Sequence, residues 1–110
     1  MSFPRFAWSC GEEASDPLVL HDGNVVRVDE LARSGHLDRQ HEDLAAVASL
    51  GVRVWRYGMP WRQVEHAPGV YDWSLWDRAL AACERHGLEP VVDLCHFGLP
   101  DHYRGSCEPA

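Results

Sequence analysis

The sequence has no long hydrophobic run, and this absence limits where the protein can work. No window of about 18 consecutive apolar residues occurs, so we expect no transmembrane helix and no membrane partner. Residues Met1 to Arg5 are not followed by the apolar stretch of a secretory signal peptide. We therefore expect a cytoplasmic protein.

Two further absences concern cofactors and nucleic acids. The glycine-rich fingerprints of dinucleotide-binding and phosphate-loop enzymes are both missing, and we expect no cofactor. Basic residues are few: 10 Lys and Arg stand against 17 Asp and Glu, which gives a formal net charge of -7. This balance argues against a nucleic-acid partner.

A cysteine framework is also missing, because the four cysteines have no regular spacing. They are Cys10, Cys83, Cys95 and Cys107. In a reducing compartment we expect no disulfide network, and we interpret Cys83 and Cys95 as small buried residues of a helix and a strand. The segment from Cys95 to Cys107 also contains His96 and His102, but its spacing fits no zinc pattern, so we expect no metal.

The chain does contain an alternation of short apolar strands and amphipathic helices. Hydrophobic residues make up 45% and charged residues 25% of the sequence, which is typical of a globular domain. The patterns predict buried strands at 6–10, 52–57 and 88–95 and helices at 38–50 and 74–86. Asp38 and Ser74 are the expected N-caps, and Gly51 and Gly87 the expected helix stops. This order predicts an α/β fold with parallel βαβ units.

Loops connect these elements at three places. Asp22-Gly23 between two apolar runs predicts a β-hairpin, and Pro68-Gly69 fixes a turn within a loop at 64–74. The first strand is followed by Glu12, Glu13 and Asp16. These carboxylates form either a solvated acidic turn or a loop in which one of them faces a ligand.

Candidate binding residues follow the predicted strands. His96 and Phe97 come at the carboxyl end of the last strand, which is the end where parallel sheets and barrels bind ligands. Arg56 lies near the end of the apolar strand 52–57 and is followed by Trp61. A guanidinium at such a place either meets carboxylates or extends its stem along the surface.

Three separate motifs resemble glycoside hydrolase family 1, the β-glucosidase-like enzymes. Residues 42–61 are similar to the family's segment E-D-x-x-L-M-x-x-L-G-x-x-x-Y-R-F-S-I-S-W, and residues 87–100 to its segment G-I-x-P-x-V-T-L-x-H-W-D-L-P. Residues 69–73 resemble a glycosidase turn, and Phe6-Ala7-Trp8 resembles the opening of the family's first strand. The chain therefore resembles a divergent amino-terminal portion of such an enzyme.

The resemblance implies a fold and a binding site. The fold would be the first three βα units of a (β/α)8 TIM barrel, left incomplete, with residues 1–110 as a single partial glycosidase-type barrel domain. Arg56 would sit beside the family's nucleophilic carboxylate and His96 would bind a sugar hydroxyl, with Phe97 and Trp61 packing nearby. The remaining tryptophans, Trp8, Trp55, Trp73 and Trp76, are expected to pack in the core or at an interface.

Several departures from the family pattern accompany the match. Phe97 replaces a tryptophan, Gly98 an aspartate and Asp93 a threonine, and the first loop lacks the family's sugar-binding glutamine. These changes leave the sugar open. The partner expected by resemblance is a carbohydrate substrate.

Two alternatives to a working hydrolase remain open. The family's two catalytic carboxylates come from strands 4 and 7, so this chain is expected to hold no catalytic residue of its own and to be inactive alone. A non-catalytic sugar-recognition or assembly module is one alternative, and self-association through the open sheet edge is expected in either case. A small α/β domain of flavodoxin-like strand order is the other.

Overall fold

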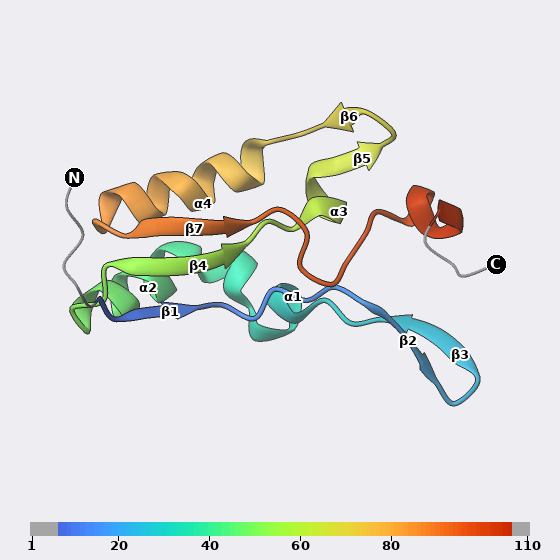
Figure 1. Ribbon diagram of the computed structural model, residues 1–110, viewed down its shortest axis with the longest axis horizontal. Helices are drawn as coiled ribbons and strands as arrows, with labels where there is room; N and C mark the ends of the chain where they lie inside the picture. Colours follow the sequence, from blue (N-terminus) through green and yellow to red (C-terminus); the bar gives the residue numbers. More distant parts are fainter. Residues whose placement is uncertain (1–6, 107–110) are drawn as a thin grey trace.

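A three-stranded parallel sheet forms the centre of the computed structural model, which describes residues 7–106 (Figure 1). The strand order is β1 (Ser9–Gly11), β4 (Val54–Gly58) and β7 (Glu89–Asp93). The chain therefore follows an α/β fold, as its alternating pattern predicts. Phe6 of the expected first strand and Cys107 lie outside the described residues.

Helices α2 (His36–Ser49) and α4 (Ser74–Arg85) pack together on one face of this sheet. The core between them contains Leu44, Tyr57 and Cys83, each no more than 1% exposed. The strands are thus neighbours in their sequence order, with both connecting helices on the same side. A flavodoxin-like sheet changes direction at its first strand, so the observed order does not match that alternative.

The helix ends show what the sequence could and could not predict. Gly51 and Gly87 follow α2 and α4 with φ angles of 80° and 65°, a left-handed conformation that glycine adopts readily. Both expected N-caps are wrong. Asp38 lies inside α2, and the N–H of Ser74 donates to the carboxylate of Asp72 over 2.9 Å because the chain enters α4 through that turn.

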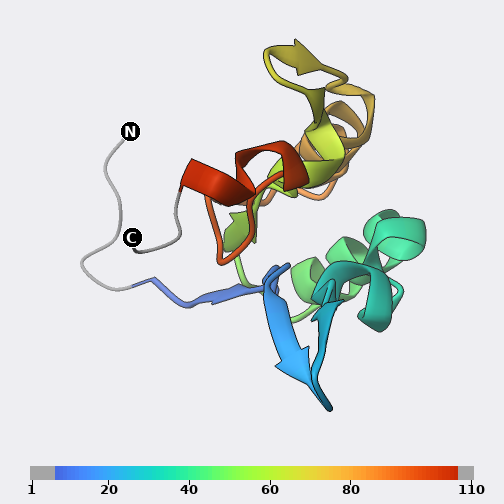
Figure 2. The ribbon, with the colours of Figure 1, turned by 90° about the vertical axis from the view of Figure 1, so that its right-hand side faces the viewer.

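The connecting segments contain more structure than the sequence predicts. The expected hairpin is confirmed as β2 (Leu18–His21) and β3 (Asn24–Arg27) around Asp22-Gly23, and α1 (Glu30–Ser34) follows it. The expected loop at 64–74 is instead α3 (Trp61–Val64) leading into a small hairpin, β5 (Glu65–Ala67) and β6 (Val70–Tyr71). A 3-10 helix, η1, covers Asp101–Ser106. Both hairpins and η1 lie beyond the carboxyl ends of the parallel strands, and Figure 2 looks onto this end.

The second face of the parallel sheet is not covered by the described residues. Val91 of β7 is 52% exposed there, and β1 is exposed along its length instead of buried as expected. Trp55 and Trp76 pack in the core as predicted, whereas Trp8 and Trp73 are exposed, at 75% and 45%. An apolar residue of the sheet stays exposed wherever no other element packs against it.

Cys83 is buried as expected, but Cys95 is exposed because β7 ends at Asp93, two residues before it. Within residues 7–106, no helix combines the length and the apolar character needed to cross a membrane.

Candidate functional site

An ion pair joins the carboxyl ends of β4 and β7. In the parallel register Arg56 lies opposite Val91 and Gly58 opposite Asp93, so the side chains of Arg56 and Asp93 both rise from the uncovered face. Nη2 of Arg56 lies 2.6 Å from Oδ2 of Asp93. The carboxylate that a strand-end guanidinium needs is therefore supplied by the neighbouring strand.

His96 completes a compact polar cluster at this point. Its Nδ1 lies 3.1 Å from Oδ2 of Asp93 and 3.2 Å from Nη2 of Arg56, and its Nε2 lies 3.3 Å from Oε1 of Glu13. The imidazole is 8% exposed, whereas the side chain of Glu13 is 64% exposed. We call these four residues, Glu13, Arg56, Asp93 and His96, the mouth cluster.

Glu13 enters the mouth cluster as an ionised group. Hydrogen bonds from the hydroxyl and the backbone N–H of Ser15 lower the pKa of Glu13, and the neighbouring His96 adds to this effect. Of the three acidic residues in the first loop, Glu13 is thus the one that faces the candidate site.

Phe97 lies against the mouth cluster with most of its ring open. Its backbone has a φ of 52°, and its ring stands edge-on to His96 with centroids 5.2 Å apart and planes at 86°. The residue is 74% exposed. The structure therefore brings together three of the four predicted binding residues: Arg56, His96 and Phe97.

Trp61, the fourth predicted residue, belongs to a separate cluster. Its indole N–H donates to Oε2 of Glu65 over 2.5 Å, and its ring lies 5.7 Å from that of Tyr103. Oε1 of Glu65 accepts hydrogen bonds from the hydroxyl of Tyr103 at 2.7 Å and the N–H of Gly69 at 2.8 Å. The role of Trp61 in binding stays a prediction. Together with Glu65, its described contacts hold η1 against the β5–β6 hairpin.

The carboxylate of Glu65 is fully buried in that second cluster. Burial raises its pKa, but the hydrogen bonds from Gly69, Tyr103 and Trp61, with the nearby His102, outweigh this and lower it to about 2. The sequence gives no signal for this carboxylate, because its partners come from positions 4 and 38 residues away.

Close backbone contacts fix the loops around the mouth cluster. A Cβ at Gly58 would lie 2.4 Å from Cβ of Ala14 and 3.3 Å from Cβ of His96. A Cβ at Gly98 would lie 2.8 Å from both Cβ and the carbonyl oxygen of Asp16. Gly98, which replaces the family's aspartate, is therefore required by the approach of the first loop.

Asp16 anchors the first loop and is not part of a solvated turn. It is 9% exposed, and its Oδ2 lies 2.5 Å from Nε of Arg62 and 3.3 Å from Nη1 of Arg27. Arg62 also reaches Asp29, the N-cap of α1, at 2.7 Å. This ion network ties the loop, the β2–β3 hairpin and α3 together, which neither spacing nor periodicity could predict.

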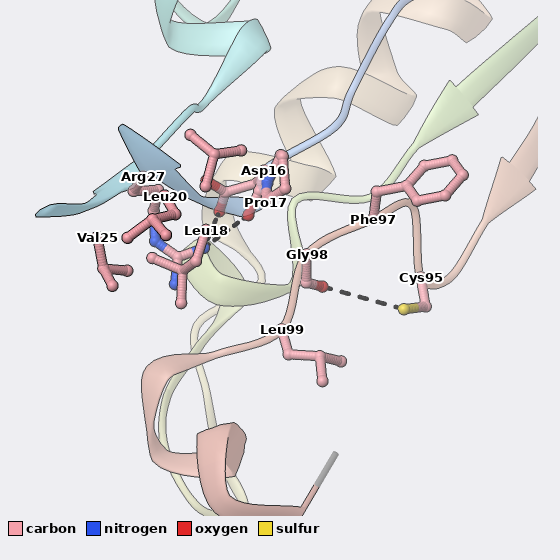
Figure 3. A pocket seen from close by; sticks show the side chains of 11 residues that line it. Asp16, Pro17, Leu18, Leu20, Val25, Arg27, Cys95, Phe97, Gly98 and Leu99 are labelled. Carbon is pink, nitrogen blue, oxygen red and sulfur yellow. Dashed lines mark hydrogen bonds and ion pairs between the residues drawn. The ribbon is translucent and has the colours of Figure 1, made fainter. Parts of the chain in front are cut away.

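A mostly apolar groove opens beside Phe97 (Figure 3). It has a volume of about 940 Å³ and lies between the β2–β3 hairpin and the segment 95–99. Figure 3 shows Leu18, Leu20 and Val25 on the hairpin side and Leu99 and Phe97 on the other. The mouth cluster is therefore a polar corner, and the exposed ring of Phe97 and this apolar groove lie beside it.

That arrangement suits a ligand that has both hydroxyl groups and an apolar face. Arg56 offers N–H donors, Asp93 and Glu13 offer acceptors, and an imidazole can do either. Within the described residues, no three His, Cys, Asp or Glu side chains are grouped to hold a metal ion.

Comparisons with known proteins find enzymes that act on carbohydrates. No family model matches the chain. The 6-phospho-β-glucosidase AscB of Escherichia coli is 32% identical over 69 residues, which cover 58% of this chain and 15% of that protein. The aryl-phospho-β-D-glucosidase BglA of Bacillus subtilis is 30% identical over 69 residues, covering 58% and 14%. This chain thus spans about a seventh of the length of these relatives.

Two solved structures also match the chain. An exo-β-1,4-mannosidase, Op5Man5 from Opitutaceae bacterium strain TAV5, superposes with a TM-score of 0.51 at 28% identity, over 79% of this chain and 14% of that one. The AHE enzyme from Alicyclobacillus herbarius, at 20% identity, shares the fold over 96% of this chain and 29% of its own, with a TM-score of 0.66.

The fold is α/β, and the named relatives that part of the chain resembles are glycosidases. More particularly, the chain resembles the β-glucosidase-like enzymes of glycoside hydrolase family 1, as its three motifs indicate. The match covers part of the chain and a small share of each relative.

Proposed function

We propose that this chain forms the first three βα units of a (β/α)8 glycoside hydrolase barrel that acts on O-glycosidic bonds. Residues 1–110 would then be one partial barrel domain. The strand order β1-β4-β7, with both helices on one face, supports this proposal because a barrel adds each strand beside the previous one. Its substrate would be a carbohydrate.

The observation that carries the proposal is the meeting of Arg56 and His96 at 3.2 Å. They come from the ends of different strands, and barrel enzymes build their active sites from the ends of several strands. In the proposed site His96 binds a sugar hydroxyl and Phe97 stacks on a sugar face. Arg56 lies beside the nucleophilic carboxylate, and Trp61 lines the site further out.

The hydrolytic carboxylates are proposed to come from barrel strands outside this chain. A retaining glycosidase needs two carboxyl groups about 5 Å apart, one as nucleophile and one as acid/base. The carboxylates of the mouth cluster are already engaged: Asp93 with Arg56 and His96, and Glu13 with Ser15 and His96. We therefore propose that the chain alone binds sugar weakly and does not hydrolyse it.

The uncovered sheet face favours a second candidate, a non-catalytic recognition or assembly module. Val91 and the ring of Phe97 are both exposed at this face or its mouth, at 52% and 74%. Such a module would bind a sugar or a second chain without needing the carboxylate pair.

Sugar binding can be tested on the chain as it exists. We would titrate ¹⁵N-labelled protein with millimolar methyl β-glucoside, methyl β-mannoside and glucose 6-phosphate, and follow the amide signals by NMR. We expect one of the sugars to shift signals of the mouth cluster and Phe97, and His96→Gln to weaken that binding at least about tenfold, the loss of one hydrogen bond between the imidazole and a sugar hydroxyl.

Arg33→Lys provides the matched control, because the side chain of Arg33 is exposed and pairs with Glu30, away from the mouth cluster. It is expected to bind sugar like the parent chain. Shifts scattered over the surface, or none with any sugar, would count against the proposed function.

A further inference from the structure

Asp93 is the residue on which the mouth cluster depends most directly. Residue 93 is an aspartate, and its carboxylate contacts two other members of the cluster. A single oxygen, Oδ2, lies 2.6 Å from Nη2 of Arg56 and 3.1 Å from Nδ1 of His96. The same two nitrogens are 3.2 Å apart, so the three atoms form a closed triangle.

We propose that Asp93 is a positioning residue that holds Arg56 and His96 in the geometry for binding neutral sugar hydroxyls. The inference rests on the proposed function for the identity of the ligand only. The positioning itself concerns contacts within the chain and can be tested without any sugar.

The positioning is needed because Arg56 is otherwise free to move. Its side chain is 57% exposed, and a long side chain in water samples many rotamers whose entropy is lost on binding. Asp93, at 28% exposed, is shielded more than Arg56 and is fixed at the end of a paired strand. A charge-assisted pair of this kind orders the guanidinium before a ligand arrives, which strengthens binding.

Asp93 also changes the charge that a ligand meets. Three charged groups face His96: Arg56 from β4, Asp93 from the end of β7 and Glu13 from the first loop. Two carboxylates against one guanidinium leave an excess of negative charge, and Nη2 of Arg56 is already taken by Asp93. An anionic group such as a phosphate would have to compete with Asp93 for the guanidinium, whereas a hydroxyl can share it.

The geometry therefore points to an unphosphorylated sugar as the ligand of this corner, although the curated relatives named above are phospho-glucosidases. In this chain, a threonine at position 93 would remove the carboxylate that pairs with Arg56 and would open the guanidinium to an anion. The substitution Asp93→Thr is thus the direct test of both the positioning and the preference.

The first measurement uses the sugar-free chain labelled with ¹⁵N at Arg and His. In the parent chain we expect separate, slowly exchanging guanidinium signals for Arg56. Asp93→Asn and Asp93→Thr should speed that exchange about tenfold or more and shift the Nδ1 signal of His96. Glu13→Gln, the matched control on the opposite side of the ring, should shift Nε2 and leave Arg56 unchanged, and Asp93→Glu should restore part of the parent pattern.

Thermal unfolding of each variant, followed by circular dichroism, shows whether the variant folds. If one Asp93 substitution does not fold, the remaining Asp93 variants carry the test. The assignment is overturned if folded Asp93→Asn and Asp93→Thr both keep the parent signals of Arg56 and His96. These signals do not depend on any ligand.

The second measurement compares methyl β-glucoside with glucose 6-phosphate by the NMR titration described above. We expect the parent chain to favour the neutral sugar and Asp93→Thr to shift the ratio of the two affinities by about two- to fivefold toward the phosphate, the range of one screened charge pair. An unchanged ratio would overturn the preference. If neither sugar binds any variant while the sugar-free signals change as expected, the proposed function fails and the positioning role stands.

Discussion

The hydroxyl of Tyr103 donates a 2.7 Å hydrogen bond to the buried carboxylate of Glu65, which lies 38 residues earlier in the chain. The same carboxylate accepts bonds from the indole of Trp61 and the backbone N–H of Gly69. Since Tyr103 belongs to η1 and Glu65 begins β5, this contact fastens the last described element to the loop that follows β4.

Stability is expected to fall in acid because of Glu65. The folded state lowers the pKa of this carboxyl from 4.5 to about 2, so the unfolded chain takes up a proton at higher pH than the folded one. The contribution to stability is present above pH 4.5 and is lost as the pH falls toward about 2. Urea unfolding measured at intervals from pH 6 to 2 should show this loss, and Tyr103→Phe should reduce it by removing one donor to the ionised form.

Tyr71→Phe is the control for that series. Tyr71 lies opposite Glu65 in the β5–β6 pair, but it is 49% exposed, its ring stacks on Trp73, and the hydrogen bonds to Glu65 come from other residues. It should follow the parent curve at every pH. A Tyr103→Phe variant with the same pH dependence as the parent would show that the hydroxyl does not help to hold Glu65 ionised.

Gly58 is expected to tolerate a side chain only if Ala14 loses its own. Gly58→Ala places a methyl group 2.4 Å from Cβ of Ala14, which forces a shift of the first loop. Overpacking of this kind costs about 2 kcal/mol of unfolding free energy. The double variant Ala14→Gly with Gly58→Ala should recover part of that loss, as measured by urea unfolding of all four proteins; strict additivity of the two changes would contradict the contact.

The sequence predicted what short-range patterns determine. Gly51 and the Asp22-Gly23 turn act through their own backbone conformations, and the apolar stripe of α4 buries Trp76 and Cys83 as its spacing requires. Of the two alternatives for Arg56, the structure shows the one in which a carboxylate, that of Asp93, meets the guanidinium.

The long-range pairs could not be predicted in the same way. Asp16 looked like any acidic loop residue, yet it is held by Arg62, 46 positions later. Trp8 and Trp73 are large apolar residues of the kind that fill a core, but both are exposed. Their burial depends on a neighbouring element that the sequence pattern does not specify.

His36 is another residue whose role comes from the fold, and it gives a prediction about stability. It is 1% exposed, with Nδ1 2.8 Å from Oδ2 of Asp43 and Nε2 2.7 Å from the hydroxyl of Tyr57. Tyr57→Phe would leave a buried ring nitrogen without its partner, which costs about 1–3 kcal/mol. His41→Ala, which removes an exposed ring, should change the unfolding free energy by no more than about 0.5 kcal/mol. Equal effects of the two substitutions would contradict a structural role for the His36–Tyr57 bond.

Hydrolysis by the chain alone is expected to be absent. Released nitrophenol from nitrophenyl β-glucoside, β-mannoside and their 6-phosphates should not exceed the rate in buffer, because the carboxylates of the mouth cluster are bound to Arg56, His96 and Ser15. Turnover that disappears in Glu13→Gln or Asp93→Asn would contradict this expectation and assign catalysis to the mouth cluster itself.

Self-association is expected because one face and both edges of the parallel sheet lack a neighbour among the described residues. β1 and β7 are its outer strands, and Val91 lies 52% exposed on the uncovered face. Unpaired strand edges and apolar faces promote contacts between chains. Light scattering should therefore give a mass above the 12.4 kDa of one chain, and the protein should bind a hydrophobic dye.

Val91→Lys places a charge on the uncovered face of the parallel sheet and should lower both the mass and the dye signal. Val70→Lys, on the exposed β6 strand outside the parallel sheet, should leave them near the parent values. A dye-negative parent chain with the mass of a single copy would show that this face needs no cover.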